Sequence, residues 1–173
     1  DWNQEAFSAE LSGKVIGLIG FGDIAQGLAG LLSGFHCRIL AYDPYFHEAA
    51  GKRLGVAACS LDEILAEADV VSLHTPLTSE TQGMVDTSFL KKMKPSAILI
   101  NTSRGKLVVE RDLAQALRMG TIAAAGLDCT EQEPIALDSP LLELENVTLL
   151  PHVAAHTYEG QLRAGPTARQ HAT

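Results

Sequence analysis

The chain alternates between short apolar runs rich in β-branched residues and amphipathic segments rich in alanine and leucine. Such runs have the length of buried strands, and the segments between them have helical spacing. Strands that alternate with helices predict a doubly wound parallel sheet with right-handed crossovers and helices on both faces. We therefore expect a three-layer αβα fold in one domain. The expected strands are Lys14–Ile19, Cys37–Tyr42, Asp69–Leu73, Ala97–Ile100, Ile122–Leu127 and Val147–Leu150.

The helical segments carry start and stop signals. Ser60 and Glu63 have capping-box spacing and predict a helix that runs to about Glu67. Gly55 and Gly120 stand where a glycine commonly ends a helix. Residues 1–11 are expected to be a lead-in segment, and residues 165–173 a truncated tail. The remaining expected helices are Ile24–Leu32, Glu48–Leu54, Glu110–Met119 and one that begins near Thr157 or Tyr158.

Composition excludes several classes of protein. A net charge of −8, from 21 acidic and 13 basic residues, argues against a nucleic-acid partner. No apolar stretch approaches the roughly 20 residues of a membrane span, and no leader sequence opens the chain. Cys37, Cys59 and Cys129 are too far apart to suggest a metal site or a disulfide framework. We expect no metal, no membrane and a cytoplasmic location.

A glycine motif joins the first expected strand to the first expected helix. Gly20, Gly22 and Ala25 spell G-x-G-x-x-A. Gly20 would allow a tight turn, and Gly22 would let the backbone approach a pyrophosphate at the helix N-terminus. A simple glycine turn is the alternative explanation, and the absence of Gly-Lys-Ser/Thr argues against a P-loop. The context favours a Rossmann-type dinucleotide site.

Asp43 follows the second expected strand, 21 positions after Gly22. An acid at about this distance binds the adenosine ribose hydroxyls of NAD and repels the 2′-phosphate of NADP. The alternative role is a turn cap, for which Asp-Pro is common. Together the glycine motif and Asp43 predict NAD as the cofactor.

Polar side chains also follow the later strands. Taken singly, Arg104 could be a surface arginine, Glu133 a solvated acid and His152 a core histidine. However, each comes just after a different strand, and ligands of parallel α/β sheets bind beyond the carboxyl ends of the strands. We therefore expect these three side chains to converge on one crevice.

This set of side chains matches a particular chemistry. A ketone that accepts hydride needs a proton donor, for which His152 is suited. A carboxylate such as Glu133 would stabilise the imidazolium. Arg104 could grip a substrate carboxylate and polarise the adjacent carbonyl. Beside NAD, the three predict an oxidoreductase acting on a small 2-keto or 2-hydroxy acid.

With these motifs in place, the chain resembles the D-isomer-specific 2-hydroxyacid dehydrogenases, in particular the D-3-phosphoglycerate dehydrogenase and hydroxypyruvate reductase branch. The resemblance covers roughly residues 11–164. The matching stretches are 17–24, 41–44, 74–78 with 80–81, 101–105, 125–128 with 131–134, and 150–152.

The resemblance implies a role for each matching residue. Arg104 would bind and polarise the substrate, Glu133 would pair with His152, and His152 would be the acid/base. Asp128 would face the nicotinamide side. The implied cofactor-binding residues are Gly20, Gly22, Asp23, Ile24, Asp43, His74, Thr75, Pro76, Thr81, Thr102, Ser103, Asp128, His152 and Ala155.

The chain also departs from the family pattern. Asp23 stands where the family often has an arginine, and an acid there repels a pyrophosphate. The family's second domain, which forms the other wall of the substrate cleft, is not found in these 173 residues. We therefore expect the cofactor domain alone, inactive in isolation. Because family members pair through this domain, a homodimer is implied.

Two other functions are compatible with the motifs. Some relatives are corepressors whose NAD-bound dimer recruits partners, so a non-catalytic NAD-sensing module is the alternative. A methyltransferase could use the glycine loop for S-adenosylmethionine. The residues Arg104, Glu133 and His152 favour the dehydrogenase over both.

Overall fold

The structure is a computed structural model, which describes residues 10–164. Most of the expected lead-in segment and all of the expected tail over residues 165–173 lie outside the described residues.

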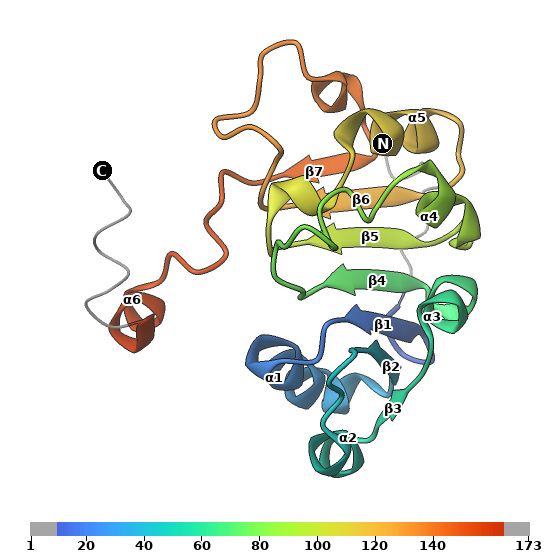
Figure 1. The fold of residues 1–173 in the computed structure, drawn as a ribbon, viewed down its shortest axis with the longest axis vertical. Coiled ribbons are helices and arrows are strands. Elements are labelled where there is room, and N and C mark those ends of the chain that lie inside the picture. The colour runs from blue at the N-terminus through green and yellow to red at the C-terminus, as the bar shows by residue number, and fades with distance from the viewer. Residues whose placement is uncertain (1–9, 165–173) are drawn as a thin grey trace, which may run out of the picture.

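Seven parallel strands form one sheet in the order β3-β2-β1-β4-β5-β6-β7. The predicted doubly wound sheet is confirmed, and in Figure 1 the strands of the sheet point the same way. From β1 the chain moves outward to β3 and then crosses back to β4. The carboxyl ends of β1 and β4 therefore border the switch point where such sheets bind ligands. The strands are β1 (Val15–Ile19), β2 (Arg38–Tyr42), β3 (Val56–Ala58), β4 (Val70–Leu73), β5 (Ile98–Asn101), β6 (Ala124–Leu127) and β7 (Val147–Leu149).

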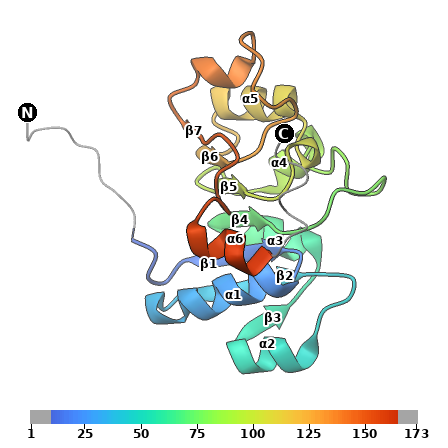
Figure 2. The same cartoon turned by 90° about the vertical axis from the view of Figure 1, so that its left-hand side faces the viewer.

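Helices cover both faces of the sheet, which confirms the three layers. Ala25, Ala29 and Ala50 of α1 and α2 pack in one apolar cluster with β1 and β2. A larger cluster joins α3, α4 and α5 to the other face, and Figure 2 shows these three along one side of the sheet. The helices are α1 (Asp23–Leu32), α2 (Glu48–Leu54), α3 (Leu61–Glu67), α4 (Thr87–Lys92), α5 (Glu110–Arg118) and α6 (Tyr158–Ala164), with short 3-10 turns η1 (Ser33–Phe35), η2 (Gly105–Leu107) and η3 (Pro140–Glu143).

The predicted helix ends are observed. Ser60 and Glu63 form the capping box at the start of α3. Gly55 takes the left-handed conformation, with a φ of 68°, and ends α2. Gly120 has a φ of 66° just beyond α5. Because these positions accept a positive φ without the steric cost of a Cβ, the chain can turn sharply back toward the sheet.

One strand, β3, and one α-helix, α4, were not anticipated, and β6 begins two residues later than expected. β3 has three residues at the sheet edge, and α4 has six, so neither repeats a period often enough to be recognised. α4 is started by Asp86, whose side chain accepts a hydrogen bond from Phe89 N at 2.9 Å. β6 begins at Ala124 rather than Ile122, because residues 121–123 form bends.

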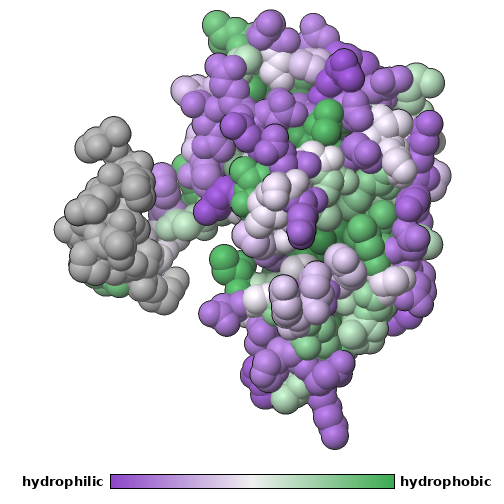
Figure 3. All heavy atoms as spheres, viewed as in Figure 1, coloured by the Kyte–Doolittle hydropathy of each residue, from purple (hydrophilic) through white to green (hydrophobic). Residues whose placement is uncertain are grey.

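Figure 3 shows hydrophilic residues around the rim of one face and hydrophobic residues gathered near its centre. Across residues 10–164, no helix combines the length and apolar character needed to cross a bilayer. Figure 1 shows α6 standing away from the sheet, beyond the strand ends.

Candidate active site

The glycine turn brings the ends of β1 and β4 into contact. Gly20 has a φ of 93°, and a Cβ there would lie 2.7 Å from the backbone of His74. Gly22 precedes α1, and a Cβ on it would meet nothing within 4 Å. The first position therefore requires glycine for the fold, whereas the second leaves open space at a helix N-terminus. This arrangement fits the phosphates of a dinucleotide.

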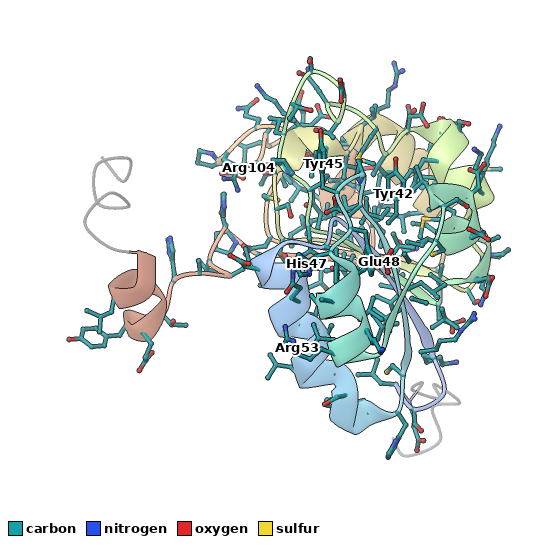
Figure 4. All side chains as sticks on the ribbon, turned by 60° about the horizontal axis from the view of Figure 1, so that its bottom comes forward. Tyr42, Tyr45, His47, Glu48, Arg53 and Arg104 are labelled. Atoms are coloured by element: carbon teal, nitrogen blue, oxygen red, sulfur yellow. The ribbon has the colours of Figure 1, made fainter. Side chains whose placement is uncertain are left out.

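Asp23 and Ile24 follow this turn and are exposed. Ile24 is 77% exposed, which is unusual for a large apolar side chain. Asp23 lines a polar cavity of about 410 Å³ with Gln26, His47 and Arg53. In Figure 4, His47 and Arg53 lie beside α1 and α2, on a different side of the domain from Arg104.

Asp43 ties the end of β2 to the glycine turn. Its Oδ2 accepts a hydrogen bond from Phe21 N at 2.7 Å, and its Oδ1 accepts one from Tyr45 N at 2.7 Å. The rings of Phe21 and Phe46 stack with centroids 4.8 Å apart. The carboxylate is thus held beside the turn, and the loop behind it is packed.

A cavity of about 250 Å³ opens beside the glycine turn. Residues after β4 and β5 meet there with Ile24 of α1. His74 is hydrogen bonded to Ser72, with Nε2 and Oγ 3.0 Å apart, and burial lowers the pKa of its imidazole. The ring is therefore neutral at neutral pH. The lining residues are Ile24, His74, Thr75, Pro76, Thr102, Ser103 and Arg104.

Arg104 is presented by a turn that Asn101 holds. Asn101 is fully buried; its Nδ2 donates to Arg104 O at 2.9 Å, and its Oδ1 accepts from Ser103 N at 3.0 Å. Arg104 is exposed and donates through Nη1 to Ser103 O at 2.7 Å. Among residues 10–164 it forms no ion pair, so its charge is available to an anion.

Asn101 was not among the predicted site residues. Its position directly after the apolar run Ala97–Ile100 is a signal that could have identified it, because an amide side chain at the end of a buried strand needs partners, which a following turn can supply.

Glu133 and His152 are in direct contact. Glu133 Oε2 lies 2.8 Å from His152 Nδ1, and both side chains are about half exposed, at 42% and 46%. The other oxygen of Glu133 accepts a hydrogen bond from Thr130 N at 3.3 Å. His152 has a φ of 56°, a conformation that costs a non-glycine residue about 1 kcal/mol or more. A histidine whose Nδ1 donates to a carboxylate presents Nε2 to a substrate.

Asp128 is buried and lines the same cavity as this pair. It is 2% exposed, and its two oxygens accept hydrogen bonds from Val153 N at 2.8 Å and Ala154 N at 2.9 Å. These bonds anchor the backbone just after His152. Asp128 is therefore a loop anchor, and it lines this cavity rather than the one beside the glycine turn.

Thr81 and Ala155 are among the predicted residues that do not line the cavity beside the glycine turn. Thr81 donates through its hydroxyl to Pro76 O at 2.7 Å, so its hydroxyl is bonded within its own loop. Ala155 is exposed in the loop after His152. Within residues 10–164, no cluster of three or more His, Cys, Asp or Glu side chains could hold a metal ion.

Arg104 and His152 line different cavities. The larger one, of about 540 Å³, has a polar edge formed by Asp128, Glu133 and His152. The rest of its lining is mainly apolar and includes Ile135, Leu142 and Leu149. The side chains thus converge at one end of the sheet but do not enclose a single cleft within the described residues.

Comparisons with known proteins agree with the predicted resemblance. Residues 1–154 match the family described as D-isomer specific 2-hydroxyacid dehydrogenase, NAD binding domain. The chain is 45% identical to D-3-phosphoglycerate dehydrogenase of Mycobacterium leprae over 165 residues, which is 95% of this chain and 31% of that protein. It is 46% identical to glyoxylate/hydroxypyruvate reductase B of Yersinia pestis over 160 residues, 92% of this chain and 48% of that protein. The chain thus spans a third to a half of these relatives.

A solved structure gives the same result. D-lactate dehydrogenase with NAD⁺ from Lactobacillus jensenii superposes with a TM-score of 0.83 at 36% identity, over 89% of this chain and 50% of that one. The predicted fold and the predicted branch of relatives are confirmed.

Proposed function

Because the chain belongs to the D-isomer specific 2-hydroxyacid dehydrogenases, whose NAD-binding domain it matches over residues 1–154, we propose that it is the cofactor domain of an enzyme that interconverts small 2-keto acids and D-2-hydroxy acids. The contact between Glu133 and His152 carries this proposal. A histidine held by a carboxylate at the carboxyl end of the sheet is suited to exchanging a proton with a substrate.

The cofactor of the family is NAD, and the glycine turn fits it. Gly20, Gly22 and the N-terminus of α1 would hold the phosphates, and Asp43 would hold the adenosine ribose. Thr75 and Thr102 line the adjoining cavity, on the side toward Arg104. When bound, NAD supplies the hydride chemistry. Asp23 is an unfavourable charge at the start of α1, since it repels a phosphate.

The remaining steps fall to side chains of this domain. Arg104 would exchange its bond to Ser103 O for a bidentate grip on the substrate carboxylate, which also polarises the neighbouring carbonyl. His152 would donate a proton from Nε2 to the carbonyl oxygen during reduction and accept it during oxidation. Glu133 would stabilise the imidazolium through Nδ1.

We further propose that another part of a longer protein completes the substrate cleft, because Arg104 and His152 line separate cavities here. The relatives named above act on 3-phosphoglycerate, glyoxylate and hydroxypyruvate, by their names. A carboxylate beside the reacting carbon is shared by these acids, and it is the group that Arg104 suits. A homodimer and a cytoplasmic location belong to the same proposal.

The test uses the full-length protein with NADH and three 2-keto acids: glyoxylate, hydroxypyruvate and 3-phosphohydroxypyruvate. We expect turnover with at least one acid, and His152→Ala should lower kcat by about 10³-fold. His156→Ala is the matched control, since it removes another exposed histidine from the same loop, and it should keep kcat within about twofold. Full activity in His152→Ala would contradict the assigned role. NADH binding without turnover of any acid would favour an NAD-sensing module.

A further inference from the structure

Two acidic residues outside the catalytic pair make a reciprocal contact between α5 and the loop after β6. Glu131 Oε1 accepts a hydrogen bond from Glu110 N at 2.7 Å, and Glu110 Oε1 accepts one from Glu131 N at 2.5 Å. We call this pair of bonds the carboxylate clasp. It joins segments that are 21 positions apart in the sequence.

Helix capping alone does not account for the clasp. Glu110 begins α5 and is half-buried, and burial together with the nearby charge of Glu131 raises its pKa. Within the described part of the chain, neither acid forms an ion pair. A serine or aspartate at the N-cap position, which Val109 occupies, would cap the first turn of α5 without placing two carboxylates together. The contact is reciprocal and joins two segments distant in sequence, which capping of the helix by itself does not require.

The loop held by the clasp carries Glu133. Thr130 donates through N to Glu133 Oε1 at 3.3 Å and through Oγ1 to Gln132 O at 2.7 Å. The other oxygen of Glu133 is the one that faces His152. The loop is therefore short and internally bonded, so a shift of Glu131 would move the Glu133 carboxylate with it.

The same loop also touches the segment that carries Arg104. A Cβ on Gly105 would lie 1.8 Å from Thr130 O, so the two backbones are in direct contact. From Gly105 the chain runs through η2 to Glu110 at the start of α5. The clasp thus links the segment that carries Arg104 to the loop that carries Glu133 at a second point, in addition to the contact of Gly105 with Thr130.

We propose that Glu110 and Glu131 are positioning residues, which hold the Glu133 carboxylate against Nδ1 of His152 and so keep Nε2 directed at the substrate. The catalytic part of this inference rests on the proposed function. The structural part, the effect on the tautomer of His152, does not.

The test compares Glu110→Ala with Glu110→Gln in the full-length protein. The glutamine keeps an oxygen that can accept from Glu131 N, whereas alanine breaks the clasp. Glu48→Ala is the matched control, because Glu48 is the first residue of α2 and exposed. The readouts are the ring ¹⁵N shifts of His152, measured where the imidazole is neutral, and kcat with KM for NADH.

We expect wild type, Glu110→Gln and Glu48→Ala to hold the Nδ1–H tautomer of His152. Glu110→Ala should shift part of the population to Nε2–H and lower kcat about tenfold, with KM for NADH unchanged within about twofold. Glu131→Ala breaks the clasp from the loop side, so it should reproduce the effect, and it replaces Glu110→Ala if that variant does not fold.

Three outcomes would overturn the inference. The first is a clasp variant that melts earlier but keeps the wild-type tautomer and kcat, which would reduce the clasp to a helix cap. The second is an equal shift of the His152 tautomer population in Glu110→Gln and Glu110→Ala. The third is a further tautomer shift on adding Glu110→Ala to Glu133→Gln, because the clasp would then act through another route. If wild type turns over no 2-keto acid, the proposed function fails, while the tautomer measurement still decides the role of the clasp.

Discussion

The carboxylate of Asp43, at the end of β2, accepts a hydrogen bond from the backbone amide of Phe21 in the glycine turn, at 2.7 Å. The residue predicted to select NAD over NADP is therefore also a brace between the first two strands. Its second oxygen accepts from Tyr45 N. A carboxylate oxygen has more than one acceptor position, so both roles are compatible.

Replacing Asp43 should therefore alter cofactor choice and the shape of the turn together. We expect the wild-type protein to bind NADH more tightly than NADPH, because the carboxylate repels a 2′-phosphate. Asp43→Ala should weaken NADH binding about tenfold or more. It should also narrow the difference between the affinities for NADH and NADPH. The NADH affinity of Asp43→Asn, which keeps one acceptor oxygen, should lie between those of wild type and Asp43→Ala. Fluorescence titration with both cofactors measures this, and equal wild-type affinities would contradict the assignment.

The two glycines of the turn should respond differently to alanine. Gly20→Ala should destabilise the fold by about 3 kcal/mol, because the φ of 93° and the 2.7 Å approach to His74 leave no room for a Cβ. Gly22→Ala should fold normally, since a Cβ there meets nothing within 4 Å, yet it should weaken NADH binding. Urea unfolding and NADH titration separate the two effects. Equal loss of stability in both variants would contradict this account.

Asp128→Ala should loosen the loop that carries His152. It removes both acceptors that hold Val153 N and Ala154 N, so exchange of these two amides with solvent should quicken by about tenfold or more. Asp138→Ala, a change of an exposed acid in a neighbouring loop, should leave both amides as they are. Hydrogen exchange followed by NMR gives the rates, and unchanged protection in Asp128→Ala would show that the loop is held elsewhere.

The sheet could be predicted from the sequence because each long strand is a compact apolar run bounded by glycine or by polar residues. β3 and α4 escaped prediction because short elements depend on their neighbours: β3 pairs along β2, and α4 depends on the Asp86 cap and on packing by Phe89 and Leu90. Local pattern carries little information about such contacts.

Some residues of the site could likewise be predicted from the sequence, and others could not. Residues directly after a strand, such as Arg104 and His152, could be singled out because the topology places them at one edge. The supporting contacts could not. The bonds that link Glu110 to Glu131 join backbone and side chains distant in sequence, and no spacing rule identifies such a pair. The family resemblance implied a cofactor contact for Thr81, whereas its hydroxyl is bonded within its own loop.

Asp69 links stability to pH at the amino-terminal end of the sheet. Its Oδ2 accepts a hydrogen bond from Val15 N at 2.8 Å, and its Oδ1 pairs with Lys94 at 3.0 Å. The bond from Val15 is the main reason that its pKa lies below the ordinary value of 3.8, with a smaller contribution from Lys94. Folding therefore favours the charged carboxylate. Its contribution to stability is present above the unfolded-state pKa and is lost as the pH falls through the lower, folded-state value.

Asp69→Asn should consequently lower the free energy of unfolding by about 1 kcal/mol near neutral pH, since the side chain is partly exposed. Because asparagine does not titrate in this range, the gap between wild type and variant should narrow as the pH falls below about 4. Asp62→Asn is the control: Asp62 pairs with Lys92 but is 74% exposed, so its loss should cost little at any pH. Urea unfolding at a series of pH values measures both gaps. A gap for Asp69→Asn that widened toward acid pH would reverse the sign of the linkage and exclude a stabilising charged carboxylate at this position.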